Sequence, residues 1–312
     1  MEQFTKKTRV AVVGAGAIGC YYGARLVQAG CHVDFLLRSD YDHVAEHGLK
    51  ITSVDGDFDL PKVRCHRQVH EIGCVDLVII AWKTTSNHLF QEVVSPLLHE
   101  DTQILTLQNG LGSVDELADL FGFQRVYGGL CFVCINRLSP GCIDHSASGL
   151  IRVGKYDPDQ KGGDTSQLAD FLTQGGIRCE GVDSLERAQW MKLVWNIPFN
   201  GLAIAEGGVD TAGLLAMDGM EERIRRIMHE VQAVAGALGY VIDDLFIEQQ
   251  IAVTRPMNQY RPSSMIDYIE GREVEVEAIW SEPMRRAKEV GVLVLEITQL
   301  YREIIQRIAQ RP

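Results

Sequence analysis

Three polar side chains, Lys192, Asn196 and Asn200, recur every four residues in the otherwise apolar stretch KLVWNIPFN. All three can donate hydrogen bonds, and the lysine ammonium can also supply a positive charge and a proton. On a helix this spacing places them on one face, where burial is costly unless they pair with one another, with the core or with a ligand. Because large apolar residues surround the stripe, we expect it to line a ligand cleft, the alternative being a wetted surface face. We also expect Pro198, which lacks an amide hydrogen, to kink or unwind the helix.

A glycine-rich turn near the start of the sequence could bind the phosphates of a dinucleotide. The stretch RVAVVGAGAIGCYYGARLVQAG has the pattern of a strand, a turn and a helix, and a second strand-like run, HVDFLLR, follows it. In G-x-G-x-x-G the first glycine permits the tight turn, the second admits the pyrophosphate and the third lets helix and strand pack closely. This context favours dinucleotide binding over a glycine turn without a ligand. The predicted binding segment comprises Gly14, Ala15, Gly16, Ala17, Ile18 and Gly19.

Residues at the ends of the predicted strands indicate which dinucleotide binds. An NAD site usually ends the second strand with an acid that bonds the ribose hydroxyls, but this strand leads to Arg38, whose guanidinium suits a 2′-phosphate. Asp34 lies within the strand and Asp40 beyond it, so we expect NADP, bound as NADPH, the alternative being that Arg38 is a solvated loop charge. Lys83 ends the run CVDLVIIAWKT, and Asn109 ends a further strand-like run, where doubly wound sheets bind ligands. Asn-Gly alone also marks a simple turn.

The order of strand and helix patterns predicts two domains. From RVYGGLCFVCINRL to GLIRVGKY we expect short strands with turns at SPG and ASG, as in a hairpin that finishes the first domain. Beyond Asp183 the sequence carries helical periodicity without a clear strand. We therefore predict an α/β protein with an N-terminal Rossmann-like doubly wound sheet in residues 1–183 and an all-helical domain in residues 184–312.

The composition argues against several classes of partner. The 312 residues include 30 Lys and Arg against 42 Asp and Glu, a formal net charge of −12 that would repel nucleic acid and anionic lipid. No apolar run is long enough to span a bilayer and no secretory signal is seen, so we expect a cytoplasmic protein that binds neither nucleic acid nor a membrane. The pair in CFVC, with Cys142 and His145 nearby, could bind zinc, but the run also has the pattern of a buried strand, and we predict no metal site.

Taken together, the motifs resemble those of the ketopantoate reductase (2-dehydropantoate 2-reductase) family over nearly the whole chain. The resemblance implies NADPH-dependent reduction of the 2-keto group of ketopantoate to give pantoate, a step toward pantothenate and coenzyme A. Lys192 matches the general acid of the family, which suits a reaction in which hydride addition to a ketone leaves an alkoxide that needs a positive charge and then a proton. The segments that carry the resemblance are GAGAIG, Arg38, WKT with Lys83, QNG with Asn109, KLVWNIPFN, SSM with Ser264, and EVEA around Glu275.

The resemblance also assigns residues to the substrate. Asn109 matches a residue near the nicotinamide and the substrate, Asn196 and Asn200 match residues that hold the substrate, and Ser264 matches the residue that binds its carboxylate. Asp210 stands where the family has an asparagine that contacts the substrate hydroxyl, and a carboxylate there can accept a hydrogen bond but not donate one. The segment AIAEGGVDTAG before it and the interval from Ser264 to Glu275 also depart from the family pattern.

Four further matches concern the cofactor. Arg38 and Lys83 match contacts to the adenosine phosphate and the cofactor, and Cys134 matches a position whose backbone lines the cofactor. Glu275 matches an acid on the nicotinamide side, the alternative being one more solvated acid like its neighbours at alternate positions.

Two other functions stay open on the sequence. The departures from the family pattern allow a related NADPH-dependent 2-keto acid reductase with a different small-molecule substrate. A protein of another class, a non-catalytic NADP-sensing regulator, would keep the glycine turn and Arg38 but would not need Lys192. Helical second domains of this kind can provide self-association surfaces, so a homodimer is the assembly we expect.

Overall fold

The computed structural model of the protein describes residues 4–159 and 162–311, and the chain forms two compact units. The first unit comprises Met1–Gln108 and Ser113–Leu185, and the second comprises Asn109–Gly112 and Glu186–Pro312. The loop Asn109–Gly112 therefore belongs with the second unit, although residues of the first unit flank it in the sequence.

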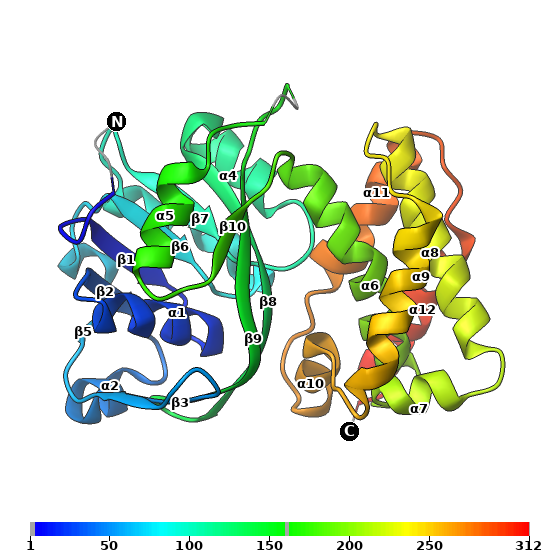
Figure 1. The fold of residues 1–312 in the computed structure, drawn as a ribbon, viewed down its shortest axis with the longest axis horizontal. Coiled ribbons are helices and arrows are strands. Elements are labelled where there is room, and N and C mark those ends of the chain that lie inside the picture. Colours follow the sequence, from blue (N-terminus) through cyan, green and yellow to red (C-terminus); the bar gives the residue numbers. More distant parts are fainter. Residues whose placement is uncertain (1–3, 160–161, 312) are drawn as a thin grey trace. The chain divides into compact units, whose positions relative to one another are not determined.

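A sheet that has ten strands within the described residues organises the first unit (Figure 1). Its path runs β4-β3-β9-β8-β7-β6-β1-β2-β5, and β10 pairs with β9. Neighbouring strands from β8 to β5 on this path are parallel, as the predicted doubly wound sheet requires. The chain passes from β1 to β2 on one side and later to β6 on the other, so the strand order reverses at β1, where such sheets bind ligands. The strands are β1 (Arg9–Val13), β2 (His32–Leu36), β3 (Leu49–Ser53), β4 (Phe58–Leu60), β5 (Arg64–His66), β6 (Leu77–Ile80), β7 (Gln103–Thr106), β8 (Val126–Ser139), β9 (Cys142–Lys155) and β10 (Cys179–Gly181).

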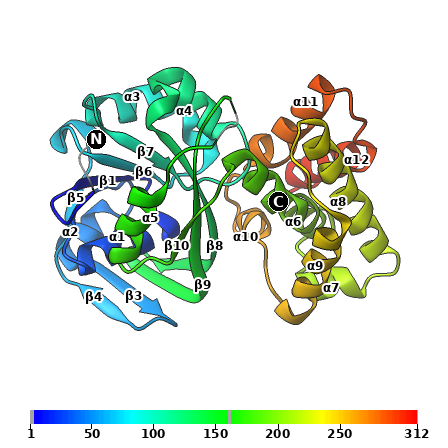
Figure 2. The ribbon, with the colours of Figure 1, turned by 45° about the horizontal axis from the view of Figure 1, so that its top comes forward.

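Helices cover both faces of this sheet. Both views show α1 and α5 on one face and α4 on the other, and Figure 2 shows α3 beside α4 (Figures 1 and 2). Successive residues of a strand point to opposite faces, so Val10 and Val12 of β1 pack in the cluster that contains α1 and α5, and Val13 points to the other face. The helices are α1 (Ala17–Gln28), α2 (Tyr41–His47), α3 (Phe90–Val94), α4 (Ser113–Phe121) and α5 (Ser166–Gln174), with 3₁₀ turns η1 (Val69–Glu71), η2 (Thr84–Leu89), η3 (Ser95–Leu97) and η4 (Phe123–Arg125).

The predicted hairpin is present, but its strands are long, and the described residues of ASG form part of a strand where a turn was expected. β8 and β9 pair antiparallel from the turn at SPG onward, and the ASG segment lies inside β9. There Ser148 and Gly149 have φ of 67° and 102°, and the register shifts between Phe132 and Val133 of the partner strand. The glycine therefore forms a β-bulge, which absorbs an extra residue without ending the ladder. Both cysteines of CFVC lie in β8, which confirms the strand predicted for that run, but the run is half-buried and not buried.

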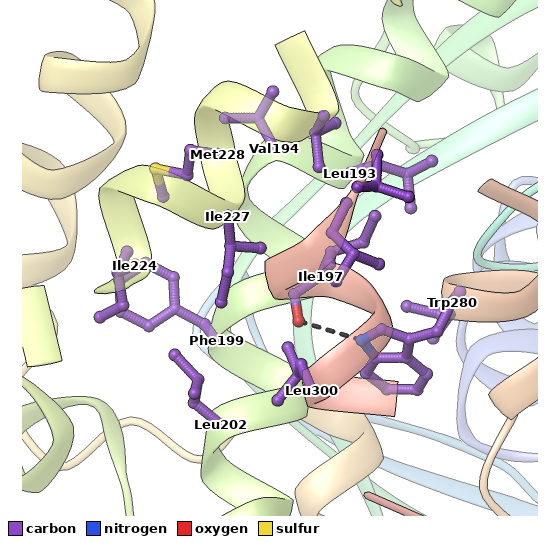
Figure 3. Packing of buried hydrophobic residues seen from close by; sticks show 14 of the residues in the cluster. Leu193, Val194, Ile197, Phe199, Leu202, Ile224, Ile227, Met228, Trp280 and Leu300 are labelled. Carbon is purple, nitrogen blue, oxygen red and sulfur yellow. Dashed lines mark hydrogen bonds between the residues drawn. The ribbon is translucent and has the colours of Figure 1, made fainter. Parts of the chain in front are cut away.

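The second unit has helices and no strand among its described residues, which confirms the predicted fold class. Its core gathers apolar residues from α6, α8, α12 and a short π-helical segment, η6, and Figure 3 shows part of this packing. Among the described helices of either unit, none is long and apolar enough to cross a membrane. The helices are α6 (Leu185–Ala205), α7 (Thr211–Ala216), α8 (Met220–Ala237), α9 (Asp244–Thr254), α10 (Ser263–Ile269), α11 (Glu282–Glu289) and α12 (Leu295–Ala309), with η5 (Arg255–Met257) and the π-helix η6 (Glu277–Ser281).

Helix α6 continues through Pro198, so the unwinding expected there does not occur. Proline removes the amide that would donate to the carbonyl of Val194, which disfavours a helix locally. Val194, Ile197 and Phe199 around it are 0% exposed, and this packing holds the turn in helical form. Tertiary burial therefore overrides the local preference, and the four-residue spacing of the polar stripe is kept.

Candidate active site

The turn after β1 has the shape that a dinucleotide pyrophosphate requires. Gly14 has φ +86°, and a Cβ there would lie 2.3 Å from the backbone nitrogen of Trp82, so a larger residue does not fit. A Cβ at Gly19 would lie 2.6 Å from the carbonyl oxygen of Gly14, which shows how closely α1 packs on the turn. A Cβ at Gly16 would meet no atom within 4 Å, and this open side is where a pyrophosphate can approach the backbone. The residues present therefore fit a dinucleotide at the N-terminus of α1.

The other predicted cofactor residues of the first unit lie in two places. Arg38 is exposed and follows β2 by two residues, while Lys83 is half-buried and follows β6 by three. Since β1, β2 and β6 are adjacent and parallel, both cations lie at the same edge of the sheet as the glycine turn. Cys134 lies instead within the hairpin, half-buried in β8, where its carbonyl oxygen accepts a hydrogen bond from the Ser146 hydroxyl at 3.4 Å. Of the remaining turn residues, Ala15 is buried, and Ala17 and Ile18 begin α1.

The acid inside β2 is committed to other partners. Asp34 is 0% exposed, and its Oδ1 accepts a hydrogen bond from Arg64 Nε at 2.8 Å and lies 2.8 Å from His66 Nε2. These contacts join β2 to β5 and leave the cation Arg38 as the charged side chain that directly follows the end of β2.

In the second unit the structure brings Lys192 and Asn109 together. The Nζ of Lys192, half-buried on α6, donates a hydrogen bond to Oδ1 of Asn109 at 2.9 Å. The two residues are 83 positions apart in the sequence. An ammonium held by an amide oxygen has a fixed position and can stabilise negative charge on a substrate oxygen and then protonate it.

The loop that carries Asn109 is fixed by the π-helix η6. The amide of Leu111 donates to the carbonyl oxygen of Ala278 at 2.9 Å. Gly110 has φ +84°, and a Cβ there would lie 2.4 Å from the same carbonyl oxygen. The close approach therefore requires glycine directly after Asn109. A π-helical turn inserted among α-helices often marks a functional site.

The same π-helix is tied to α6. The indole Nε1 of Trp280 donates to the carbonyl oxygen of Ile197 at 3.2 Å, and the indole is completely buried (Figure 3). Ile197 lies in the helical turn between Asn196 and Asn200 on α6. The contacts thus close a ring from Lys192 through the loop and η6 back to α6, which holds the ammonium and its amide partner in register.

Asn200, the third member of the stripe, anchors helix α10. It is 2% exposed, and its Oδ1 accepts a hydrogen bond from the backbone amide of Ser264 at 2.9 Å. Its Nδ2 donates to the backbone carbonyl of Asn196 at 3.1 Å. The structure therefore brings Asn196, Asn200 and Ser264 together, and burial increases along the stripe from the half-buried Lys192 to Asn200.

The two predicted acids of this unit have different environments. Asp210 is half-buried at the start of α7, where its Oδ1 accepts a hydrogen bond from the amide of Gly213 at 2.9 Å and caps the helix. Glu275 is 7% exposed, whereas Glu273 and Glu277 beside it are exposed. A carboxylate buried to that degree needs a cation or hydrogen-bond donors, so Glu275 is not one more solvated acid.

Sequence reasoning missed several residues that hold the site together. Ala278 and Trp280 carry no sequence signal of their own, because their roles depend on a π-helix and on partners more than 80 positions away. The glycine of QNG was a visible signal, but on the sequence alone it predicted no more than a turn. Within residues 4–159 and 162–311, no group of three or more His, Cys, Asp and Glu side chains is arranged to hold a metal ion.

Comparisons with known proteins agree along the whole chain. The family model described as Ketopantoate reductase PanE/ApbA matches residues 10–158, and the model of its C-terminal part matches residues 184–307. A 2-dehydropantoate 2-reductase of Nostoc sp. (strain PCC 7120 / SAG 25.82 / UTEX 2576) is 40% identical over 301 residues, 95% of this chain and 94% of that protein. The crystal structure of a 2-dehydropantoate 2-reductase from Geobacter metallireducens GS-15 superposes with a TM-score of 0.90 at 42% identity, over 96% of this chain and 99% of that one.

A more distant structure shares the fold. The ternary structure of a D-mandelate dehydrogenase with NADH and anilino(oxo)acetate has a TM-score of 0.87 at 23% identity, over 96% of this chain and 98% of that one. At this identity the likeness concerns the fold alone.

Proposed function

Because this chain belongs to the ketopantoate reductase family and is an oxidoreductase, we propose that it reduces 2-dehydropantoate to pantoate with NADPH, a step toward pantothenate and coenzyme A. In this reaction the keto carbon gains a hydride and the keto oxygen gains a proton. When bound, NADPH supplies the hydride. The chain must therefore hold the dinucleotide, hold the keto acid and deliver the proton.

The observation that carries the proposal is the contact between Lys192 and Asn109. The ammonium stabilises the negative charge that develops on the keto oxygen and then transfers a proton to it, which makes Lys192 the general acid. The hydrogen bond of 2.9 Å to Asn109 Oδ1 orients the ammonium for this transfer. Half-burial among apolar residues of α6 lowers the local dielectric and strengthens the charge interaction.

The choice of NADPH rests on the residues around β2. Arg38 is an exposed cation just past the strand, and we propose that its guanidinium binds the 2′-phosphate. The acid within the strand, Asp34, is already paired with Arg64 and His66. We propose that the turn from Gly14 to Gly19 holds the pyrophosphate and that Lys83 and the backbone of Cys134 contact the cofactor. The resemblance to the family assigns a cofactor contact to Glu275 as well.

The substrate ligands belong to the second unit. We propose that the Ser264 hydroxyl binds the substrate carboxylate and that the Asn196 amide contacts the substrate. Asn200 supports both, because it fixes the backbone amide of Ser264 and the carbonyl of Asn196. Asp210 accepts a hydrogen bond from the substrate hydroxyl where an asparagine could also donate one.

A related 2-keto acid reductase is the second candidate. Asp210 in place of asparagine favours it, because a carboxylate there can accept a hydrogen bond but not donate one, which suits a keto acid of different polarity at its far end. A non-catalytic NADP sensor is a poorer explanation, because it would leave the half-buried pair of Lys192 and Asn109 without use.

The deciding experiment follows NADPH oxidation by absorbance with 2-dehydropantoate and a panel of other 2-keto acids, with NADH in parallel. We expect turnover with NADPH that is largely confined to 2-dehydropantoate. Turnover of another keto acid alone would support the second candidate, and no turnover of any keto acid would support the sensor.

Replacement of Lys192 tests the mechanism. Lys192→Ala should lower turnover by roughly 10² to 10⁴, the range for losing a general acid, and should leave NADPH binding nearly unchanged. The matched control is Lys288→Ala, which removes an exposed lysine from α11 of the same unit and should change neither quantity. Unchanged turnover in Lys192→Ala would remove Lys192 from the mechanism.

Location and assembly also stay proposals. We propose a cytoplasmic enzyme that works as a homodimer. Fractionation of cells and the mass of the purified protein in solution, measured by light scattering, test the two proposals separately.

A further inference from the structure

A buried carboxylate lies two residues past Arg38. Asp40 is 3% exposed, and its Oδ1 accepts hydrogen bonds from the Ser39 hydroxyl at 2.8 Å and from Arg137 Nη1 at 2.7 Å. Its second oxygen, Oδ2, is buried without a hydrogen-bond partner. The buried carboxylate of Asp40 therefore requires a nearby positive charge, and Arg137 supplies it.

The partner comes from a distant part of the same unit. Arg137 lies in β8, 97 positions from Asp40 in the sequence, and its side chain is 41% exposed. Removing the partner of a buried charge leaves that charge uncompensated, so the net charge around Asp40 depends on Arg137.

The charges of Asp40 and Arg137 affect a titratable group beside the dinucleotide turn. Cys20 lies in α1, just after the glycine turn, and burial raises the pKa of its thiol to about 12. The negative charge of Asp40 raises this pKa further, and the positive charge of Arg137 lowers it. The two side chains therefore act on the same region with opposite sign.

An uncompensated Asp40 would oppose binding of a 2′-phosphate. The Cα atoms of Arg38 and Asp40, two residues apart, lie at most about 7 Å from one another, and the screening length at physiological ionic strength is about 8 Å. For a phosphate bound at about 7 Å from the Asp40 carboxylate, and at effective dielectric constants between those of a protein surface and water, repulsion between two unit charges weakens binding roughly 3- to 50-fold. An acid near the end of β2 is also the feature that favours ribose hydroxyls over a 2′-phosphate.

We propose that Arg137 is a specificity-determining residue for NADPH, which neutralises Asp40 so that Arg38 can bind the 2′-phosphate. Arg137 acts through Asp40 and is a positioning residue, not a phosphate ligand. The inference rests on the proposed use of NADPH.

The test uses binding of adenosine fragments by calorimetry, so that catalysis is not needed. The probes are 2′,5′-ADP, which carries the 2′-phosphate, and AMP, which lacks it. Arg137→Met should weaken 2′,5′-ADP by roughly 3- to 50-fold and leave AMP unchanged. Asp40→Asn should bind 2′,5′-ADP at least as tightly as the wild type, and the double variant Asp40→Asn/Arg137→Met should recover most of the lost affinity.

A matched control comes from the same hairpin. Arg152 of β9 pairs with Glu180 and is 46% exposed, similar to Arg137, so Arg152→Met should change neither affinity. Thermal unfolding of each variant shows whether it is folded. If Arg137→Met is not folded, the single variant Asp40→Asn still decides, because weaker binding of 2′,5′-ADP to it would overturn the proposal.

The remaining outcomes separate this inference from the proposed function. A loss in Arg137→Met that the double variant does not recover would mean that Arg137 contacts the phosphate directly, and the neutralising role would be wrong. Normal binding by Arg137→Met, with a loss in Arg38→Met, would overturn the inference and leave the use of NADPH intact. If the wild type binds the two fragments equally well, the proposed preference for NADPH itself fails, and the inference fails with it.

Discussion

Replacing Gly110 with alanine should impair both stability and turnover, because this glycine is held against η6. Gly110 has φ +84°, a conformation that costs an alanine about 1 to 2 kcal/mol. The added Cβ would lie 2.4 Å from the carbonyl oxygen of Ala278 and 2.5 Å from its carbon, and such overpacking typically costs about 1 to 3 kcal/mol. We therefore expect the free energy of unfolding to fall by about 2 to 5 kcal/mol.

The effect on turnover follows from the displacement that the new atom forces. Real Cβ atoms essentially never approach another atom within 3.0 Å, so the loop must move by at least about 0.6 Å from its contact of 2.4 Å. Asn109 is the adjacent residue, and it holds Lys192 at 2.9 Å. Because a misplacement of about 1 Å can cost about 10²-fold in rate, we expect kcat to fall roughly 10- to 100-fold.

The assay compares urea unfolding and steady-state kinetics of Gly110→Ala with those of Gly271→Ala. Gly271 is in the same unit and has φ +72°, but a Cβ there would meet no atom within 4 Å. Gly271→Ala should therefore lose only the conformational cost of about 1 to 2 kcal/mol and keep its kcat. If the two variants are equally stable and equally active, the contact between Gly110 and Ala278 does not position the site, and the reasoning is refuted.

Three further predictions concern other contacts. Trp280→Phe removes the indole donor to the carbonyl of Ile197. It should lower the free energy of unfolding by about 1 kcal/mol, and it should also lower kcat. A loss of stability at unchanged kcat would show that this contact is structural only. Asp210→Asn keeps the cap on Gly213, since asparagine caps as well as aspartate, so the melting temperature should hold while the KM for 2-dehydropantoate falls; an unchanged KM would leave capping as the only role of Asp210. His145 is 1% exposed, and burial lowers its pKa below the ordinary value of 6.5. Just below pH 6.5 the unfolded chain therefore binds more protons than the folded protein. Stability that is present above pH 6.5 is lost as the pH falls. Unfolding free energies at about pH 7.5 and 5.5 should show this loss in the wild type and less of it in His145→Gln, and equal losses would exclude His145 as the cause.

The two local expectations that were wrong share a physical cause. Pro198 was expected to kink or unwind its helix, and the helix does not unwind there; the ASG segment was expected to form a turn, and it lies within a strand. In both cases the local cost is real, but the surrounding core or the neighbouring strand supplies enough packing and hydrogen bonding to override it. Neither source of stabilisation is visible in the residues at the position itself.

The roles of the site residues divide in the same way. The sequence indicated that Lys192, Asn196 and Asn200 share a face, because the spacing alone decides this on a helix. It did not indicate that Asn200 fixes the start of α10, or that Asp210 caps α7, because these depend on where other segments fold. The catalytic and binding roles assigned to these residues stay predictions until the variants are measured.

What the sequence by itself determined is local in origin. The β-branched run before the glycine turn, the arginine after β2 and the helical periodicity beyond Asp183 each act through neighbours in the chain, and their order was enough to predict the two domains and the fold class. The tertiary structure decided which polar groups meet: Lys192 with Asn109 across 83 positions, and Arg137 with Asp40 across 97. Such pairs are selected by the packing of whole elements, since charge and hydrogen-bond partners are satisfied in space and leave no regular spacing in the sequence.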